Sequence, residues 1–506
     1  MEQGASSTNR WPGRVLQALR ISAFALVLAH IVIVAAVIVL RIGYLYELEW
    51  MEGGMLDHVG RLLEGKSLYV APSLDFVPFL YPPLYYSISA LAAKLLGLSF
   101  LPLRSVSLAS SIFCGWLIYR FASSEEGREA GWLAVGLFVA TFFIGGAWFD
   151  LARVDMLFLA LLLAAFSTVK DRQTAGRYAL AGLLLGLAFL TKQTTLVAAA
   201  PFVGYALWRD KLKALPMPVV GIVIAGGVLF MLHRASSGWS SFYILELPKG
   251  HGWHFSSLIS FWTNDLLGVL GIAVIVASAG ILGMPSGKRM WWLFVVAGVG
   301  SAAFVSRLHD GGYVNVLIPL YAVGAVLFGI GAVRLDVWVE SLKPRATIAA
   351  STLLYGAICV QFVSLVSNPA AQVPSRAHAE AGERVEAFMR AQSGVLYAPA
   401  HGYLAARSGH AFGAHAMAVM DLLRTDLEER SLLVDDFAEA LTEQRFERIL
   451  LPEIADIGLG LSDPHAESLY VRIDSLGGAV LRGAEAFRPV VGHPERPGAV
   501  YAPVLE

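Results

Sequence analysis

The sequence predicts a polytopic α-helical membrane protein, with about eleven transmembrane helices, and a soluble C-terminal α/β domain. Of its 506 residues, 56% are hydrophobic and only 15% are charged, whereas a soluble protein carries roughly a quarter charged residues. Apolar runs recur up to about residue 366, and the charge density then returns to that of a soluble protein. The net charge of −1 gives no sign of a nucleic-acid partner. We expect a cytoplasmic tail over 1–20, a transmembrane domain over 21–366 and a soluble domain over 367–506.

The first apolar run predicts a retained membrane anchor. Three arginines precede it, and it covers residues 21–40 with His30 as its only interruption. About 20 apolar residues are long enough to span a bilayer, and the preceding arginines favour a cytoplasmic N-terminus. No small-residue cleavage site follows, so we expect this run to remain as a signal anchor.

The other apolar segments can be ordered by the basic clusters between them. The segments are 83–98, 104–119, 131–149, 156–169, 178–208, 216–232, 263–283, 290–306, 313–333 and 346–366. Because Lys and Arg near span ends resist translocation, the clusters at their ends belong on the cytoplasmic side. Parity then makes 83–98 an interfacial helix within a long periplasmic loop over 43–103.

The run 178–208 is too long for one crossing. As a single helix it would measure about 46 Å, against a hydrocarbon core of about 30 Å. We expect two short crossings that turn at residues 191–194. About eleven crossings result, and the C-terminal domain lies on the periplasmic side of a bacterial inner membrane.

Ionisable side chains gather in the predicted external loops. They are Glu47, Glu49 and Glu52 in the first loop, Asp150, Arg153 and Asp155 in the second, Lys192 in the short hairpin, and Arg307, His309 and Asp310 in a later loop. Charged groups at membrane depth are costly and indicate function by default. Transfer of a sugar from a polyprenyl phosphate requires a carboxylate that takes the acceptor proton and cations that hold the phosphate leaving group. The external face carries both kinds of group.

Several motifs, in order along the chain, resemble one family. They are RLLEGKSLY from Arg61, YPPLYY from Tyr81, Asp155 before an apolar helix, GLAFLTK ending at Lys192, and a late span from Tyr313 to Pro319. This order, over most of residues 20–330, resembles the GT-C superfamily of membrane glycosyltransferases, in the branch of protein mannosyltransferases and aminoarabinose transferases. The resemblance implies a polyprenyl-phosphate-sugar donor, inversion at the anomeric carbon and catalysis at the periplasmic face.

The resemblance also suggests roles for individual residues. The family's first-loop acid pair is absent here, and Glu52 is the acid nearest to its expected position, so we expect Glu52 as the general base and Glu49 as the second choice. Asp155 matches the family's second-loop acid, and a helix N-terminus also favours an acid there. The expected catalytic residues are Glu52, Asp155 and Glu49; the donor-phosphate residues are Lys192, Arg307 and Arg153; the substrate-binding residues are Tyr81, Tyr85, His309 and Tyr313.

Simpler roles remain open for these side chains. Arg153 can pair with a neighbouring aspartate, Lys192 can extend to the membrane interface, and Asp57 is expected to be a solvated helix residue. His251 and His254 have the spacing of metal ligands but lack a third ligand. No cofactor is indicated with certainty, and a divalent metal ion remains open.

Residues 377–506 show the pattern of a small α/β domain. We expect helices over 380–392 and 437–448, and short strands over 395–398, 448–451, 471–473, 488–491 and 500–504. No nucleophile elbow, phosphate loop or metal spacing occurs there. An acceptor-binding or lid role is a hypothesis for this domain.

Three other functions compete with the glycosyltransferase. A transporter or lipid flippase would show internal repeats and charges near the bilayer midplane, and neither is evident. A scaffold or receptor with an extracytoplasmic sensor domain leaves the ionisable groups of four loops unexplained. An O-antigen-ligase-like or polymerase-like enzyme belongs to the same chemical class. The sugar stays open, and the acceptor can be a lipid, a glycan or a protein.

Overall fold

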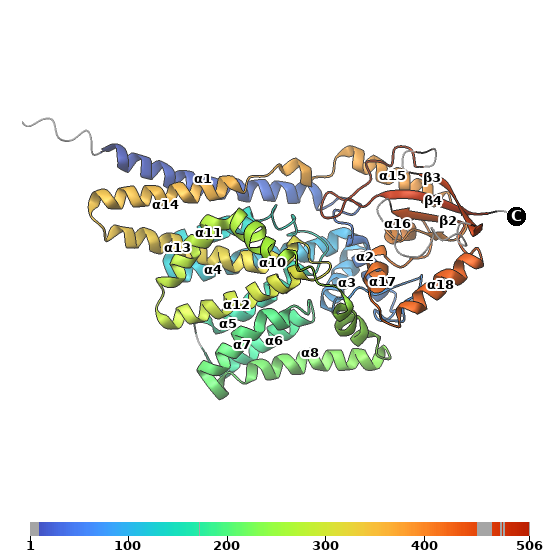
Figure 1. Cartoon of the computed structure of the whole chain (residues 1–506), viewed down its shortest axis with the longest axis horizontal. Helices are drawn as coiled ribbons and strands as arrows, with labels where there is room; N and C mark the ends of the chain where they lie inside the picture. The colour runs from blue at the N-terminus through green and yellow to red at the C-terminus, as the bar shows by residue number, and fades with distance from the viewer. Residues whose placement is uncertain (1–9, 172, 453–467, 476–477, 479–480, 505–506) are drawn as a thin grey trace, which may run out of the picture.

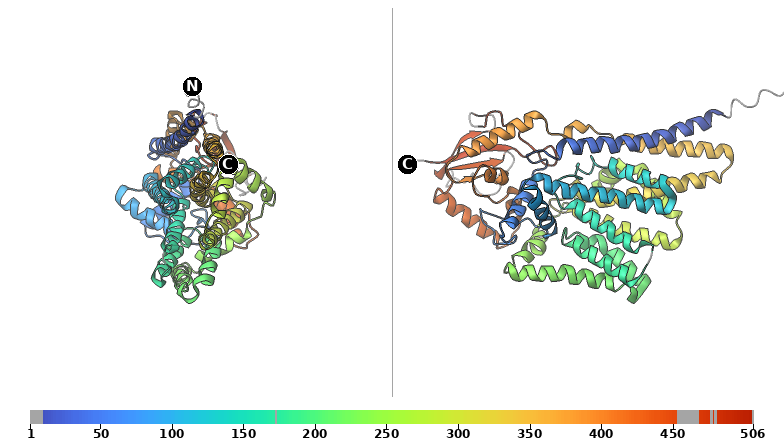
Figure 2. Two further views of the ribbon diagram at one scale, coloured as in Figure 1. Left: turned by 90° about the vertical axis from the view of Figure 1, so that its left-hand side faces the viewer. Right: turned by 180° about the vertical axis from the view of Figure 1, so that it is seen from behind.

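A helical bundle and a small mixed sheet at one end of it make up the computed structural model (Figures 1 and 2). The structure describes residues 10–171, 173–452, 468–475, 478 and 481–504. Within them, seven helical segments are long and apolar enough to cross a membrane: 13–41, 100–140, 216–235, 257–282, 286–308, 314–340 and 346–364. The protein is therefore a helical membrane protein, as its composition predicts.

The first half of the bundle contains two long helices, one of them with a break, and three short helices. Helix α1 (Arg10–Arg41) is followed in the bundle by α4 (Phe100–Ala140), whose helical conformation is interrupted at Glu126 and Gly127. Gly127 has φ +79°, which an L residue rarely adopts, so α4 consists of two helices that overlap the predicted segments 104–119 and 131–149. The second helix ends at Ala140, nine residues before the predicted end, and turns follow it. Helices α5 (Asp155–Lys170), α6 (Ala175–Phe189) and α7 (Thr195–Asp210) follow.

The predicted helical hairpin over 178–208 is confirmed as two helices. Helices α6 and α7 are 15 and 16 residues long, and the turn between them contains Thr191 and Lys192. At about 1.5 Å per residue each is a short helix of roughly 23 Å. A glycine lets α6 pack closely on helix α8 (Pro216–Ala235), since a Cβ on Gly182 would lie 2.2 Å from the Met217 carbonyl oxygen.

The second half of the bundle is built around one buried helix. Its main helices are α8 (Pro216–Ala235), α11 (Gly268–Leu282), α12 (Ser286–Leu308), α13 (Ile318–Glu340) and α14 (Pro344–Ser364). Short helical pieces α9 (Trp239–Ser241), η2 (Phe242–Glu246), η3 (Leu247–Gly250), α10 (Ser257–Ser260) and η4 (Phe261–Leu267) join α8 to α11. Helix α13 packs against α4 and α11 and is the most buried of the candidate spans.

Two short helices lie in the long loop between α1 and α4. They are α2 (Glu52–Leu63) and α3 (Leu84–Leu96), and they pack against each other beside the start of α4. Leu91, Leu95 and Leu96 on α3 remain exposed. Helix α3 lies within the predicted segment 83–98 and has 13 residues; its position at a membrane interface stays a prediction.

The sheet has four strands in the order β1-β2-β4-β3. Strand β1 (Leu396–Tyr397) runs parallel to β2 (Arg448–Pro452), which pairs antiparallel with β4 (Pro497–Pro503); β4 pairs antiparallel with β3 (Tyr470–Ser475). Helices α15 (Arg376–Arg390), α16 (Gly402–Arg407), α17 (Ala416–Leu423) and α18 (Arg430–Thr442) lie around it.

Two expectations for this region need correction. The predicted helix over 437–448 begins earlier and ends at Thr442, because Arg448 already starts strand β2. The predicted strand over 488–491 does not join the sheet. Val491 instead makes a single parallel bridge with Glu49 of the loop between α1 and α4.

The sheet region and the loop between α1 and α4 share one hydrophobic core. Met55 and Phe79 from the loop are buried in the same cluster as Tyr403 and Leu422 from the sheet region. A Cβ on Gly53 of α2 would lie 2.6 Å from the Tyr403 ring, so the absence of a side chain lets α2 approach α16. The C-terminal residues are therefore held against this loop of the bundle.

Candidate functional site at the sheet end of the bundle

Glu52 is fully buried and both of its carboxylate oxygens are occupied. At the start of α2, its Oε1 accepts hydrogen bonds from Arg104 Nε (3.1 Å) and the Ala152 N–H (2.7 Å). Its Oε2 accepts from Arg104 Nη2 (2.6 Å) and the Leu48 N–H (2.7 Å). Burial alone would raise the pKa of Glu52, but the Arg104 guanidinium and the donated hydrogen bonds hold it below its ordinary value. This geometry gives Glu52 a structural role.

Arg104 completes that role by organising the loop after α1. Its guanidinium also donates to the carbonyl oxygens of Tyr44 (2.6 Å) and Tyr46 (2.7 Å). A second buried pair, between Arg41 Nε and Asp150 Oδ2 (2.9 Å), ties the end of α1 to the loop before α5. These two ion pairs hold the backbone segments that carry the other two acids, Glu49 and Asp155.

Glu49 lies three residues earlier and is held differently. Its Oε2 accepts from Arg153 Nη1 (2.7 Å) and the Met51 N–H (3.2 Å). Among the described residues, no hydrogen bond reaches its Oε1. Burial raises the pKa of Glu49 to about 7, although Arg153 opposes the increase. A carboxylate with one anchored oxygen, one free oxygen and a pKa near neutrality is suited to general-base catalysis.

Arg153 connects Glu49 to the rest of the cluster. Besides Glu49, it donates through Nη2 to the Tyr81 hydroxyl oxygen (3.1 Å), and its guanidinium lies 5.2 Å from the centre of the Trp148 ring. Burial would lower the pKa of Arg153, but the Glu49 carboxylate raises it, so the side chain stays charged. Its Nε has no hydrogen-bond partner among the described residues.

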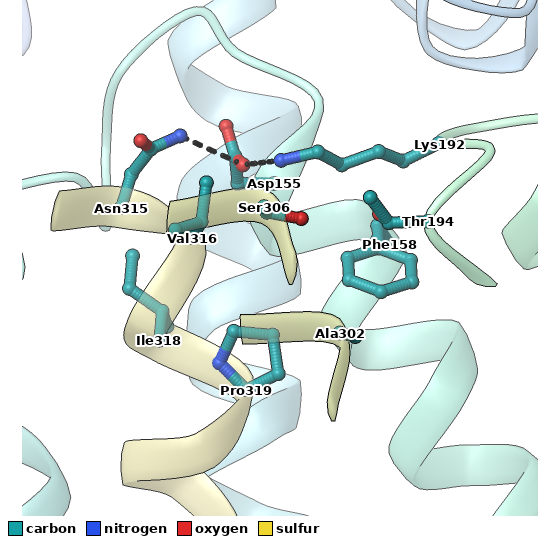
Figure 3. Close-up of a pocket in the computed structure, with 10 residues that line it drawn as sticks. All are labelled: Asp155, Phe158, Lys192, Thr194, Ala302, Ser306, Asn315, Val316, Ile318 and Pro319. Carbon is teal, nitrogen blue, oxygen red and sulfur yellow. Dashed lines mark hydrogen bonds and ion pairs between the residues drawn. The ribbon is translucent and has the colours of Figure 1, made fainter. Parts of the chain in front are cut away.

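Asp155, at the N-terminus of α5, sits between three donors, of which Figure 3 shows Lys192 and Asn315. Its Oδ1 accepts from Lys192 Nζ (2.6 Å) and Asn315 Nδ2 (3.0 Å). Its Oδ2 accepts from Trp148 Nε1 (2.8 Å). Lys192 is placed by the tight α6–α7 turn, and Asn315 by the 3₁₀ turn η5 (Val314–Leu317) before α13.

A pocket opens beside this cluster. It is lined by Asp155, Phe158, Lys192, Thr194, Ala302, Ser306, Asn315, Val316, Ile318 and Pro319. Figure 3 shows the polar groups of Lys192, Asp155 and Asn315 at one side and the apolar side chains of Phe158 and Pro319 at the other. The buried hydroxyl of Thr194 has no partner among the described residues. Its lining combines a cation, an unpaired donor and an apolar wall, and its volume of about 10 Å³ holds about one water molecule.

The structure thus brings six of the predicted site residues into one chain of contacts. They are Glu49, Arg153, Tyr81, Asp155, Lys192 and Tyr313, the last with its ring 5.6 Å from that of Trp148. Sequence reasoning missed Trp148 and Asn315. Trp148 precedes the Asp150–Asp155 acids, which is a weak signal, and nothing in the sequence around Asn315 indicates its contact with Asp155.

The other predicted site residues lie outside this chain. The buried Tyr85 hydroxyl donates to the Leu103 carbonyl oxygen (2.9 Å). Arg307 is held by Asp265 (2.8 Å) and the Gly312 carbonyl oxygen (2.7 Å), and His309 packs against Trp253. Glu52 adjoins the chain through the N–H of Ala152, the residue before Arg153.

Two further expectations concern Asp57 and a metal site. Asp57 is buried rather than solvated, and its oxygens have no partner among the described residues. Burial raises the pKa of Asp57 well above its ordinary value. His254 pairs with Asp310, and His251 contacts Asp421 instead. Within the described residues no group of three His, Cys, Asp or Glu side chains could hold a metal ion.

Part of the chain matches a known family. Residues 81–233 match the family described as dolichyl-phosphate-mannose-protein mannosyltransferase. This segment contains Tyr81, Arg153, Asp155 and Lys192. No curated protein matches the chain by sequence.

Solved structures show the fold. ArnT from Cupriavidus metallidurans in the apo state is 12% identical with a TM-score of 0.58, over 98% of each chain. The same protein bound to undecaprenyl phosphate has a TM-score of 0.59 at 12% identity, over 94% of this chain and 97% of that one. An Archaeoglobus fulgidus oligosaccharyltransferase tethered with an acceptor peptide has a TM-score of 0.52 at 12% identity, over 88% and 69%.

These family and structural neighbours are GT-C glycosyltransferases, as the motif order suggests. The chain therefore has the fold of the GT-C membrane glycosyltransferases, and its residues 81–233 are the part that matches the dolichyl-phosphate-mannose-protein mannosyltransferase family.

Proposed function

We propose that the protein transfers a sugar from a polyprenyl-phosphate donor to a hydroxyl acceptor at the periplasmic face of a bacterial inner membrane. The contact chain from Glu49 through Arg153 and Trp148 to Asp155 and Lys192 carries this proposal, because it joins a base to a cationic pocket. ArnT is solved bound to undecaprenyl phosphate, and an Archaeoglobus fulgidus oligosaccharyltransferase is solved with a dolichol phosphate and an inhibitory peptide. Undecaprenyl phosphate and dolichol phosphate are both lipid phosphates, as is the lipid part of the proposed donor.

The proposed topology has about eleven crossings. They are α1, the two halves of α4, α5, α6, α7, α8, α11, α12, α13 and α14, with the N-terminus cytoplasmic. Basic residues of the predicted cytoplasmic loops share partners, since Lys170 and Lys288 both pair with Glu125. Arg334 pairs with the adjacent Glu126 at the break in α4. In this topology every residue of the contact chain is in, or at the end of, a periplasmic connection.

Glu49 is the base in the proposed reaction, in place of Glu52. The acceptor oxygen attacks the anomeric carbon, its proton passes to Oε1 of Glu49, and the bond from the anomeric carbon to the phosphate oxygen breaks. Glu52 cannot take this role readily, because all of its hydrogen bonds are made to Arg104 and to the backbone. Its low pKa also leaves little driving force for proton transfer.

The departing polyprenyl phosphate needs positive charge and hydrogen-bond donors. Lys192 and the unpaired Thr194 hydroxyl line the pocket, and Arg153 lies next to it with an unpaired Nε. Asp155 holds the Lys192 ammonium in place through a 2.6 Å contact. Preorganised donors of this kind stabilise the charge that develops on a leaving group.

The proposal is tested by sugar transfer in proteoliposomes. Purified protein is reconstituted with a panel of polyprenyl-phosphate sugars and membrane-extracted acceptor, with and without a chelator to detect a requirement for a divalent metal ion. Transfer that depends on Glu49 supports the enzyme. No transfer with any donor, together with movement of lipid or solute across the bilayer, would overturn the proposal in favour of a transporter or flippase.

Lys192→Ala is expected to weaken the donor interaction. Loss of the ammonium removes a charge from a partly desolvated pocket, and the KM for the donor should rise by about tenfold or more. Lys249→Ala is a matched control, since Lys249 is an exposed lysine that pairs with Glu246. Equal donor KM values for the Lys192 and Lys249 variants would place the phosphate elsewhere.

A further inference from the structure

A groove lies where the bundle meets the sheet region (Figure 1). It is bounded by residues 43–45 after α1, residues 98–101 at the start of α4, and helix α16. Its volume is about 530 Å³, which is within the range of about 300–1,000 Å³ that ligand pockets have. The pocket beside Asp155 has a volume of about 10 Å³. The groove is therefore the one of these two cavities with room for an organic ligand.

The groove lies at the ends of two candidate membrane spans. The span 13–41 ends just before it, and the span 100–140 begins within it. Leu45, Leu98 and Leu101 line the groove, yet they are 66%, 43% and 42% exposed. Because the hydrocarbon core of a bilayer ends where its spans end, these leucines lie at the level of the lipid headgroups. The groove therefore opens at the membrane surface.

The lining has an apolar part and a basic part. Leu56, Phe100 and Phe412 contribute to the apolar part. Arg407 at the end of α16 and His410 just after it form the basic part, and no acid is among the described residues that line the groove. Apolar walls beside a guanidinium and an imidazole are complementary to an amphiphile with an anionic head.

Arg407 is held in place and keeps some of its donors. Its Nη1 donates to the Leu45 carbonyl oxygen (3.0 Å), and its Nη2 donates to Glu386 Oε2 (3.0 Å). The other oxygen of Glu386 accepts from Arg390 (2.8 Å), so two guanidinium groups share one carboxylate. The Arg407 side chain is 37% exposed. Its remaining N–H groups can therefore donate to a phosphate in the groove.

We propose that the groove binds one anionic membrane phospholipid, with an acyl chain against Leu98 and Leu101 and its phosphate at Arg407. Helix α16 lines one side of the groove, and the ends of α1 and α4 line the other. The bound lipid contacts both parts and stabilises their packing. This inference does not rest on the proposed function.

The lipid is distinct from the substrates of sugar transfer. No described residue that lines the groove belongs to the contact chain of the candidate site. The Phe100 ring, which lines the groove, lies 4.7 Å from the Arg104 guanidinium. Arg104 pairs with Glu52, whose Oε1 accepts from the Ala152 N–H beside Arg153. The buried ion pair thus stands between the groove and the contact chain.

Arg407→Gln tests the phosphate contact. Binding is measured as the rise in the thermal unfolding temperature of the detergent-purified full chain during titration with phosphatidylglycerol, because a ligand of the folded state stabilises it saturably. Loss of a charge-assisted hydrogen bond should raise the apparent Kd by about tenfold or more. Arg390→Gln is the matched control and should keep the wild-type Kd, since Arg390 pairs with the same Glu386 but does not line the groove.

Ala406→Phe tests the apolar part of the groove. Ala406 is half-buried on α16 and lines the groove, so a phenyl group there takes up space that the acyl chain needs. The apparent Kd for phosphatidylglycerol should rise in this variant too. Ala387→Phe is its control, because Ala387 is exposed on α15 and does not line the groove.

The outcomes identify the ligand as well as the site. Saturable stabilisation by phosphatidylglycerol that is weakened in Arg407→Gln and Ala406→Phe, and not in the two controls, supports the proposal. Equal Kd values for Arg407→Gln and Arg390→Gln, or equal stabilisation by phosphatidylcholine, would overturn it.

Two further ligands distinguish other sources of the same chemistry. Stabilisation by glycerol 3-phosphate alone contradicts the proposal, because no acyl chain is then needed. Stabilisation by undecaprenyl phosphate and not by phosphatidylglycerol also contradicts it, and assigns the groove to the lipid of the donor. None of these measurements depends on sugar transfer, so failure of the lipid site leaves the proposed function unchanged.

Discussion

Glu49→Gln is expected to lower the rate of sugar transfer by about 10²- to 10⁴-fold, the range that a general base contributes. Gln keeps the size of the side chain and an oxygen that can accept from Arg153 Nη1 and the Met51 N–H. It cannot accept the acceptor proton. In the proposed site the donor contacts Lys192 and not Glu49, so the KM for the donor should change by less than about twofold.

The pH dependence of transfer provides an independent test of the same base. Burial raises the pKa of Glu49 to about 7, and a general base acts only when it is ionised. The kcat/KM of the wild type should therefore fall as the pH drops below about 7. Glu49→Asp, which retains a carboxylate, should keep a similar profile at a lower rate.

Glu64→Gln is the control for the removal of one negative charge, because Glu64 is an exposed acid that lies just after helix α2 and pairs with Lys66. Its transfer rate should equal that of the wild type. If Glu49→Gln remains within about tenfold of the wild type while folded, Glu49 is not the base. A folded Glu52→Gln variant without transfer would restore Glu52 to that role.

Much of the fold could be predicted because membrane segments obey simple length rules. The excessive length of 178–208 predicted a turn near Lys192, and the structure has two helices on either side of it. The break at Gly127 separates two segments that the hydropathy also separates. By length and composition, seven segments qualify as spans among the described residues, compared with about eleven predicted. Helices α5, α6 and α7 do not qualify because they have only 15 to 16 residues each, and the two halves of α4 count as one segment.

The difference between Glu49 and Glu52 could not be predicted from sequence. The two acids are three residues apart in one loop, and motif spacing favours Glu52. Two arginines distant in the sequence determine their environments. Arg104 of α4 donates to both carboxylate oxygens of Glu52, whereas Arg153 donates to only one oxygen of Glu49. Spacing along the chain carries no information about which arginine reaches which acid.

The contact between residues 488–491 and the first loop was also beyond sequence reasoning. An alternating apolar pattern predicts extended backbone but does not name its partner. Val491 pairs with Glu49 and not with the neighbouring strands of the sheet. The part of the chain without catalytic motifs thus contacts the loop that carries the proposed base.

Glu52→Gln should act on stability before it acts on chemistry. Removing one partner of a buried ion pair leaves the other charge uncompensated, at a cost of about 3–5 kcal/mol. Here the stranded charge is Arg104, which is 0% exposed and anchors the loop carbonyls of Tyr44 and Tyr46. We expect a large fall in the thermal unfolding temperature in detergent, and a smaller yield of folded protein.

The double variant Glu52→Gln with Arg104→Met distinguishes this structural role from catalysis. Replacing both partners removes the uncompensated charge, so the double variant should be more stable than Glu52→Gln alone, which gives a positive coupling between the two sites. If Glu52 is structural, the transfer rate per folded molecule should recover along with stability. If Glu52 is the base, stability should recover while transfer stays absent. The ratio of transfer to folded protein in the double variant therefore decides which of the two neighbouring acids takes the proton.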